Sequence, residues 1–161
     1  MVMQRLQGWD CKLIYSDPYR MPEEMEKKLN CEYVSLETLL RESDVVSLHC
    51  PLTEQTRGMI GKEQLAMMKP NAIIVNEARG AVIDDKALVE ALQNGTIWGA
   101  AIDTWEKEPL DPNDPLVKME KVITTSHLGA ATRETVIRCF SIGYQNILRQ
   151  IHGEELVNRI V

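Results

Sequence analysis

The sequence predicts an α/β fold in which helices cover both faces of a parallel β-sheet. Segments with strand and helix patterns alternate along the whole chain, and the strand segments are continuous apolar runs rather than alternating ones. In addition, charged or titratable residues follow several of these runs. Because parallel sheets bind ligands beyond the carboxyl ends of their strands, these residues are candidates for a site.

The composition indicates one globular domain. The chain has 161 residues, of which 44% are hydrophobic, and this is enough for a packed core. The net charge of −6 argues against nucleic acid as a partner, and no apolar run reaches the roughly 18 residues of a membrane span. Cys11, Cys31, Cys50 and Cys139 are scattered, so we expect reduced thiols in the cytoplasm rather than a metal site or a disulfide framework.

The first half of the chain predicts three strands. Residues 1–8 have the pattern of a helix end, and the strands that follow are CKLIYSD, CEYVS and DVVSLHC, the third ending at Pro51. Between the strands, Pro22 can occupy the first turn of the helix PEEMEKKL. Ser35 can cap a second helix, whose leucines recur on one face.

The second half predicts three more strands, NAIIVNEA, IWGAAID and KVITTS. A short helix over residues 62–68 precedes the first of them, and Asp84 caps a helix that Gly95 ends. The last helix is long and ends at Gly153. Its apolar residues recur every three or four positions, at Val136, Ile137, Phe140, Tyr144, Ile147, Leu148 and Ile151.

Candidate site residues follow five of the six strands. In chain order they are Asp17; His49, Cys50 and Pro51; Asn76 to Gly80; Asp103; and Ser126 with His127, while Glu108 lies in the proline-rich loop after Asp103. Each also has an ordinary structural interpretation, for example a turn aspartate or a surface arginine. Periodicity does not establish that these residues meet in space.

The three residue types Arg, Glu and His support a specific chemistry. The planar guanidinium of Arg79 can bind a carboxylate through two hydrogen bonds. His127 can exchange a proton near neutral pH, and a glutamate beside it would raise the pKa of the imidazole. Together they suit the oxidation of a 2-hydroxy acid, in which the hydride leaves for a cofactor.

Four segments identify a resemblance that covers nearly the whole chain. They are LHCPLTEQTRGMIG, MKPNAIIVNEARGAVIDDKALVEAL, GAAIDTWEKEPL and TSHLGAATRET. With these segments the chain resembles the NAD-binding domain of the D-isomer-specific 2-hydroxyacid dehydrogenases, which include D-phosphoglycerate and hydroxypyruvate/glycerate dehydrogenases. The resemblance implies a Rossmann-like, doubly wound parallel sheet, NAD as cofactor, a small 2-hydroxy or 2-keto acid as substrate, and a homodimer.

The resemblance also implies a role for each candidate. The substrate-binding arginine corresponds to Arg79, the acid/base histidine to His127 and its helper glutamate to Glu108. Asp17 corresponds to the acid that binds the ribose, and Asp103 to the carboxylate near the nicotinamide carboxamide. Other positions that would line the cofactor are His49, Cys50, Pro51, Thr56, Ala78 and Gly129, together with Arg79 and His127.

The chain departs from the family pattern in several places. The first strand, its glycine-rich loop and the substrate domain have no counterpart, so we expect residues 1–161 to form a partial NAD-binding domain that binds NAD weakly and is inactive by itself. Glu77 and Ser126 replace a small residue and a proline, and Glu77 can face the cofactor or point outward. Asp17 favours NAD over NADP, although Arg20 is close along the chain.

Two other functions are compatible with parts of the pattern. One is an NAD-sensing binding module of the corepressor type, which shares this fold and the same Arg, Glu and His set. Hydride transfer to a 2-keto acid separates it from the enzyme. The other is a methyltransferase, which shares the acid after a strand and would bind S-adenosylmethionine instead of NAD.

Overall fold

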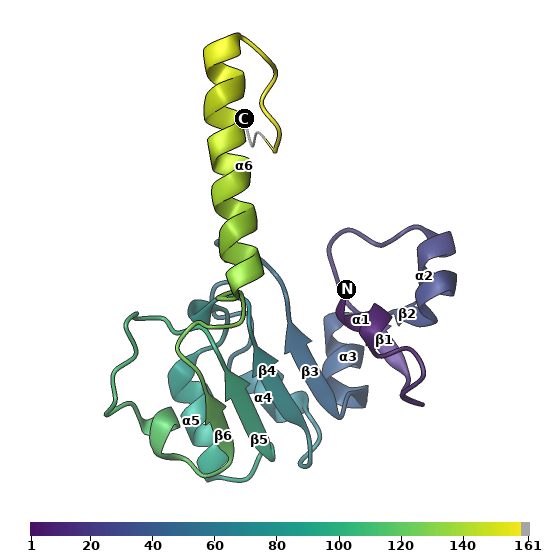
Figure 1. Ribbon diagram of the computed structural model, residues 1–161. Coiled ribbons are helices and arrows are strands. Elements are labelled where there is room, and N and C mark those ends of the chain that lie inside the picture. Colours follow the sequence, from purple (N-terminus) through teal and green to yellow (C-terminus); the bar gives the residue numbers. More distant parts are fainter. Residues whose placement is uncertain (159–161) are drawn as a thin grey trace. The chain divides into compact units, whose positions relative to one another are not determined.

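Parallel strands form the frame of residues 1–126 and belong to two sheets (Figure 1). In the first sheet β1 (Leu13–Tyr15) pairs with β2 (Cys31–Tyr33). The second sheet has the order β3-β4-β5-β6, formed by β3 (Val45–Leu48), β4 (Ile73–Asn76), β5 (Gly99–Ile102) and β6 (Val122–Thr124). The computed structural model describes residues 1–158 and separates them into two units, Met1–Ser126 and a second that begins at His127.

Helices alternate with these strands along the chain, as the sequence predicts. They are α1 (Val2–Arg5), α2 (Glu23–Leu29), α3 (Leu36–Glu42), α4 (Lys62–Met67), α5 (Asp85–Gln93) and α6 (Arg133–His152), with 3-10 turns η1 (Gly80–Val82) and η2 (Pro115–Lys118). The α/β class and the parallel sheet are therefore confirmed.

Local capping chemistry places two helix starts where the sequence predicts them. Ser35 Oγ accepts a hydrogen bond from the backbone N–H of Thr38, at 3.1 Å, at the start of α3. The Asp84 carboxylate accepts two backbone N–H groups of α5, at 3.0 and 3.1 Å. The end of α6 is also as predicted, because Gly153 adopts the left-handed conformation with φ 72°.

The division into two sheets agrees with the Rossmann-like sheet without its first strand that the sequence analysis expects. A Rossmann sheet places its first strand at the centre of the strand order. Within residues 1–158 no strand takes that place, so pairing stops at β1 on one side and at β3 on the other. Both edges belong to the first unit.

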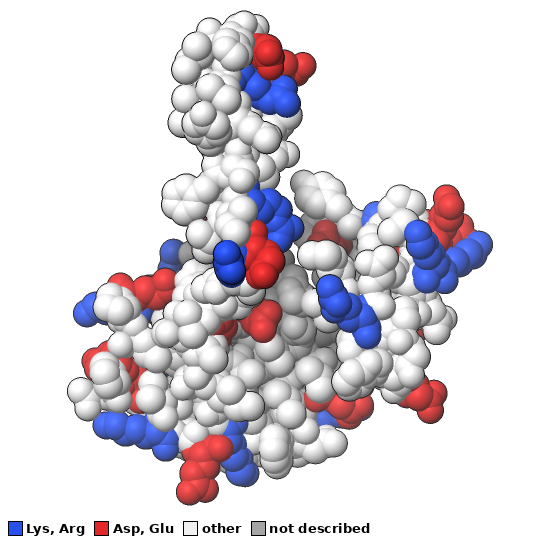
Figure 2. Space-filling view, viewed as in Figure 1, with Lys and Arg blue, Asp and Glu red and all other residues white. Residues whose placement is uncertain are grey.

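Charged side chains are interspersed on the face of the molecule that Figure 2 shows. Blue and red groups alternate over the surface of the first unit, and most of the surface between them is uncharged. Among the described residues visible in this view, charge of one sign therefore does not single out a site, and the carboxyl ends of the strands remain the place to search.

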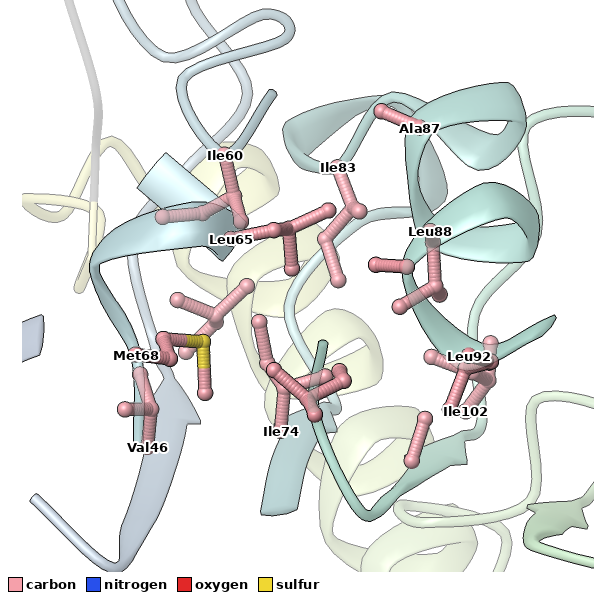
Figure 3. Packing of buried hydrophobic residues seen from close by; sticks show 14 of the residues in the cluster. Val46, Ile60, Leu65, Met68, Ile74, Ile83, Ala87, Leu88, Leu92 and Ile102 are labelled. Carbon is pink, nitrogen blue, oxygen red and sulfur yellow. The ribbon is translucent and has the colours of Figure 1, made fainter. Parts of the chain in front are cut away.

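One hydrophobic core joins the four-stranded sheet to α3, α4 and α5 (Figure 3). Ile74 from the sheet, Leu65 from α4 and Leu88 from α5 are at most 1% exposed. Burial alternates along β3, where Val46 is buried and Val45 is 58% exposed. β3 therefore has one covered and one exposed face, whereas the continuous apolar run predicts that both are covered.

The second unit consists mainly of α6, a helix of 20 residues. Its apolar stripe matches the predicted spacing and is between 36% and 76% exposed. No helix in residues 1–158 is long and apolar enough to cross a membrane.

Candidate functional site

A cleft of about 530 Å³ lies where β3 and β4 end. Its lining combines two loops that the sequence analysis selected, namely His49, Cys50, Pro51 and Leu52 after β3, and Glu77, Ala78 and Arg79 after β4. The structure therefore brings together most of the cofactor-lining positions that the resemblance implies in this unit.

The loop after β3 is shaped by a threonine side chain. Thr56 Oγ1 donates to the carbonyl oxygen of Pro51 at 2.6 Å and accepts the backbone N–H of Thr53 at 2.8 Å. The His49 ring nitrogen Nε2 lies 2.9 Å from Ser47 Oγ. Thr56 thus holds the turn that presents Pro51 and its neighbours to the cleft.

Cys50 contributes a neutral thiol to this wall. It is half-buried, and burial raises the pKa of the thiol above its ordinary value. Because the thiolate is the reactive form, Cys50 lines the cleft without being an activated nucleophile.

The loop after β4 is built around Asn76, which the sequence analysis included among the candidates at this strand end without giving it a role. Its side chain is buried, accepts the backbone N–H of Ala78 at 3.1 Å and donates to the carbonyl oxygen of Arg79 at 3.0 Å. Arg79 Nη1 also donates to the carbonyl oxygen of Ala78 at 2.6 Å. A polar residue that ends an otherwise apolar run is the signal that could have indicated this role.

Gly80 brings the Arg79 loop against the loop after β5. A Cβ atom at Gly80 would lie 2.1 Å from the carbonyl carbon of Trp105, so only glycine allows this approach. The backbone N–H of Trp105 donates to Glu108 Oε1 at 3.2 Å. The predicted substrate arginine and the predicted helper glutamate therefore lie in loops that contact each other.

Trp105 and Asp103 connect these loops to the end of β6. The Trp105 indole donates from Nε1 to the carbonyl oxygen of Thr125 at 2.8 Å, and Thr125 Oγ1 donates to Asp103 Oδ1 at 2.5 Å. Asp103 and Trp105 are each 7% exposed. With the backbone N–H of Asp103 donating to the carbonyl oxygen of Asn76 at 3.0 Å, the carboxyl ends of β4, β5 and β6 form one hydrogen-bonded group.

Asp17 occupies the corresponding position in the two-stranded sheet. It follows β1, is exposed, and accepts the backbone N–H of Tyr19 through Oδ1 at 2.8 Å. Its carbonyl oxygen accepts a hydrogen bond from Tyr33 Oη at 3.2 Å. Asp17 therefore forms a turn, and its exposed carboxylate at the strand end also has the position and chemistry to bind a ribose hydroxyl.

Glu77 lines the cleft and is exposed there. Of the two alternatives that the sequence left open, the structure supports the one in which Glu77 faces the cofactor-binding side. It adds a negative charge to a cleft that would hold an anionic dinucleotide.

His127 and Gly129 belong to the second unit. His127 has φ 57°, in the left-handed region that few residues other than glycine adopt. It follows Ser126 directly, at the position where the family pattern has a proline. A convergence of His127 with Arg79 and Glu108 stays a prediction.

The fold and this cleft define a dinucleotide-binding α/β domain, and comparisons with known proteins agree. The family described as "D-isomer specific 2-hydroxyacid dehydrogenase, NAD binding domain" matches residues 1–129. Glyoxylate reductase from Korarchaeum cryptofilum is 47% identical over 99% of this chain and 49% of that protein. The chain spans about half the length of the curated relatives it matches.

Solved structures show the same similarity. D-lactate dehydrogenase with NAD+ from Lactobacillus jensenii is 32% identical, with a TM-score of 0.91 over 99% of this chain and 51% of that one. A glyoxylate reductase from Paecilomyes thermophila is 35% identical, with a TM-score of 0.90 over 99% of this chain and 48% of that one. The chain belongs to the D-isomer specific 2-hydroxyacid dehydrogenase family, in which it is an NAD-binding domain.

The residues present fit NAD as the cofactor. An exposed acid follows β1, and the cleft after β3 and β4 has loops whose backbone groups and small side chains can line a dinucleotide. Within residues 1–158 no group of three or more His, Cys, Asp or Glu side chains is arranged to bind a metal.

Proposed function

We propose that the chain is the cofactor-binding part of an NAD-dependent oxidoreductase that interconverts 2-keto acids and D-2-hydroxy acids. The observation that carries this proposal is the contact between the Arg79 and Glu108 loops, made through Gly80 and Trp105. It supports a substrate site in which an arginine and an acid lie at the same edge of the sheet as the cleft. The substrate domain would be supplied by sequence outside these 161 residues.

Arg79 would bind the substrate carboxylate, because a guanidinium offers two parallel N–H donors to the two oxygens. His127 would take the hydroxyl proton during oxidation and return it during reduction. Glu108 would hold the imidazole and favour its protonated form. When bound, NAD supplies the hydride acceptor or donor. Asp103 would lie near its carboxamide, where Thr125 orients the carboxylate.

The substrate class follows from the arginine and from the named relatives. A bidentate arginine selects an acid with a free carboxylate. The relatives are named as reductases of glyoxylate and hydroxypyruvate and as a dehydrogenase of D-lactate, all small 2-oxygenated acids. None of the relatives named here is a corepressor. We therefore propose glyoxylate and hydroxypyruvate as the first substrates to test.

The test is an NADH oxidation assay with the complete protein that contains these residues. Glyoxylate should oxidise NADH, and Arg79→Ala should lower kcat/KM by at least about a hundredfold because the carboxylate loses its bidentate partner. Arg57→Ala, an exposed arginine that pairs with Glu106, serves as the control. A protein that binds NADH tightly but oxidises it with none of glyoxylate, hydroxypyruvate and pyruvate contradicts the proposal.

We also propose a homodimer in the cytoplasm. The support for dimerisation is the exposed apolar stripe on α6, and Figure 2 shows few charged side chains along the middle of this helix. The support for a reducing compartment is that the four cysteines are free. Sedimentation of the wild type against Phe140→Glu tests the dimer. A monomeric wild type contradicts it, as does an unchanged dimer in the variant.

A further inference from the structure

We propose that Glu26 is a positioning residue for cofactor selection. Glu26 binds Arg20, whose guanidinium lies near the proposed ribose-binding acid Asp17. It thereby keeps this guanidinium from binding the 2′-phosphate of NADP. This inference rests on the NAD-binding character of the domain and not on turnover. It concerns the selection of NAD over NADP, which Asp17 alone does not decide when an arginine lies three residues further along.

Arg20 is held by two hydrogen bonds to a single carboxylate. Arg20 Nε donates to Glu26 Oε1 at 2.8 Å, and Nη2 donates to Oε2 at 2.9 Å, which is the bidentate geometry that arginine prefers. The guanidinium carbon also lies 5.3 Å from the centroid of the Tyr33 ring. Although the Arg20 side chain is 59% exposed, the edge formed by Nε and Nη2 is thus occupied by Glu26.

Glu26 is the fixed partner of this pair. Its side chain is 9% exposed, and Tyr15 Oη donates to Oε1 at 2.6 Å. The hydrogen bonds from Arg20, and next from Tyr15, lower the pKa of Glu26 to about 2. The carboxylate is therefore charged near neutral pH, so the ion pair between Glu26 and Arg20 persists there.

The pair lies next to the ribose-binding acid because both contact the same tyrosine. Tyr33 Oη donates to the carbonyl oxygen of Asp17 at 3.2 Å, and the ring of Tyr33 faces the guanidinium of Arg20. Tyr15 Oη in turn accepts the backbone N–H of Met21 at 2.9 Å, which fixes the loop between Asp17 and α2. Arg20 is thus placed on the same tyrosine as Asp17 and turned toward Glu26.

A 2′-phosphate would need this arginine. The phosphate is an anion, Asp17 repels it, and a free guanidinium nearby would offset that repulsion. A guanidinium whose fork already binds a buried carboxylate cannot offer the same donors. The neutral hydroxyls of the NAD ribose need only the acid. Glu26 therefore strengthens a preference for NAD that begins with Asp17.

The test measures nucleotide binding to the 161-residue chain without any substrate. NADH and NADPH are titrated separately, and the backbone amide shifts of Asp17 and residues 19–21 report the binding. This readout covers millimolar as well as micromolar dissociation constants. The variants are Glu26→Gln, the double variant Glu26→Gln with Arg20→Ala, and Arg20→Ala. Glu23→Gln is the matched control, since it removes an equal charge and an exposed ion pair from the same helix.

Glu26→Gln should lower the ratio of the NADPH to the NADH dissociation constant by about tenfold. The double variant should restore the wild-type ratio, and Glu23→Gln should leave it unchanged. If Glu26 were only structural, Glu26→Gln would weaken both nucleotides alike and leave the ratio where it was. That result overturns the proposal.

Arg20→Ala keeps the question answerable if Glu26→Gln does not fold, because Arg20 is largely exposed. In the wild-type background it should not change the ratio, since the arginine is already engaged. A selective loss of NADPH affinity in Arg20→Ala would show that Arg20 already serves the phosphate, and would overturn the proposal. The absence of amide shifts at Asp17 and residues 19–21 with either nucleotide would also overturn the proposal.

Discussion

Two carboxylates in the first unit, Glu26, which is buried, and Asp85, which is half-buried, respond to their surroundings in opposite ways. Glu26, beside the end of β1, has a pKa lowered to about 2 by hydrogen bonds from Arg20 and Tyr15. Asp85, at the start of α5, has a pKa raised to about 6, first because burial disfavours its charge and then because Asp114, Glu106 and Asp84 repel it. Burial stabilises a carboxylate only where a partner replaces the lost water.

The same difference separates two groups of strand ends that would line the cofactor, namely the end of β1 and the ends of β4, β5 and β6. At the β1 end, charged groups on or near the surface hold the loop. At the ends of β4, β5 and β6, close backbone packing and hydrogen bonds around Trp105 hold it. We therefore expect packing changes to dominate the effect of mutations in the second region, and charge changes to dominate it in the first.

The largest expected effect is that of Gly80→Ala. The new Cβ would meet the backbone of Trp105 at 2.1 Å, and this backbone cannot move without displacing the Glu108 loop. We expect a loss of about 3 kcal/mol in the free energy of unfolding, measured by urea denaturation. Gly143→Ala is the control, because nothing lies within 4 Å of its Cβ and alanine favours a helix. Equal losses of stability in Gly80→Ala and Gly143→Ala would refute the idea that close packing against Trp105 makes Gly80 necessary.

The second largest effect is expected at Asp17, after β1. Asp17→Asn keeps an oxygen that can accept the Tyr19 N–H but removes the charge that would bind the ribose. NADH affinity should fall about tenfold, as expected for the loss of a charge-assisted hydrogen bond. Asp111→Asn is the control, since Asp111 forms the same kind of turn with Asn113 at 2.8 Å. An unchanged NADH affinity in Asp17→Asn would mean that Asp17 forms the turn but does not bind the ribose.

A third effect follows from the raised pKa of Asp85. The folded chain binds a proton at Asp85 more tightly than the unfolded chain does. The contribution of Asp85 to stability therefore falls as the pH rises from about 4 to about 6. Asp85→Asn should stabilise the protein by about 1 kcal/mol at pH 7.5, after allowance for its partial exposure, and by almost nothing at pH 4. Unfolding midpoints in urea at the two pH values measure this difference.

The control for Asp85→Asn is Glu63→Gln, an exposed acid in the first turn of α4. Its midpoint should change little at either pH. If Asp85→Asn destabilises the protein at pH 7.5, the favourable interaction of a carboxylate with the start of α5 outweighs its burial.

The smallest effect tests the charge that Glu77 adds to the cleft. Glu77→Gln should tighten NADH binding by about threefold, because it removes a carboxylate that repels the anionic cofactor across solvent. The gain should shrink as salt is added. Glu54→Gln, on the exposed loop after β3, is the control. A weaker affinity in Glu77→Gln would mean that Glu77 contacts the cofactor favourably.

Local signals predicted most of the elements, because caps, prolines and apolar runs act over a few residues. Ser35, Asp84 and Gly153 lie where the sequence placed them. The strand-end rule also selected the Arg79 loop, which lines the cleft. It could not reveal the contact between Gly80 and Trp105, because these residues are brought together only by the packing of neighbouring strands.

The Arg20–Glu26 pair was also beyond prediction from the sequence. Arg20 could equally have served a phosphate, because its partner Glu26 is one of several acids in a charged helix. Here too the deciding information is three-dimensional.

Trp105 gives the protein an optical reporter at the edge where the proposed chemistry would take place. It is 7% exposed, whereas Trp9 and Trp98 are 74% and 53% exposed. A water-soluble quencher such as iodide should therefore suppress the emission of Trp9 and Trp98 and leave a blue-shifted signal from Trp105. Movement of the Glu108 loop could then be followed by fluorescence without attaching a dye.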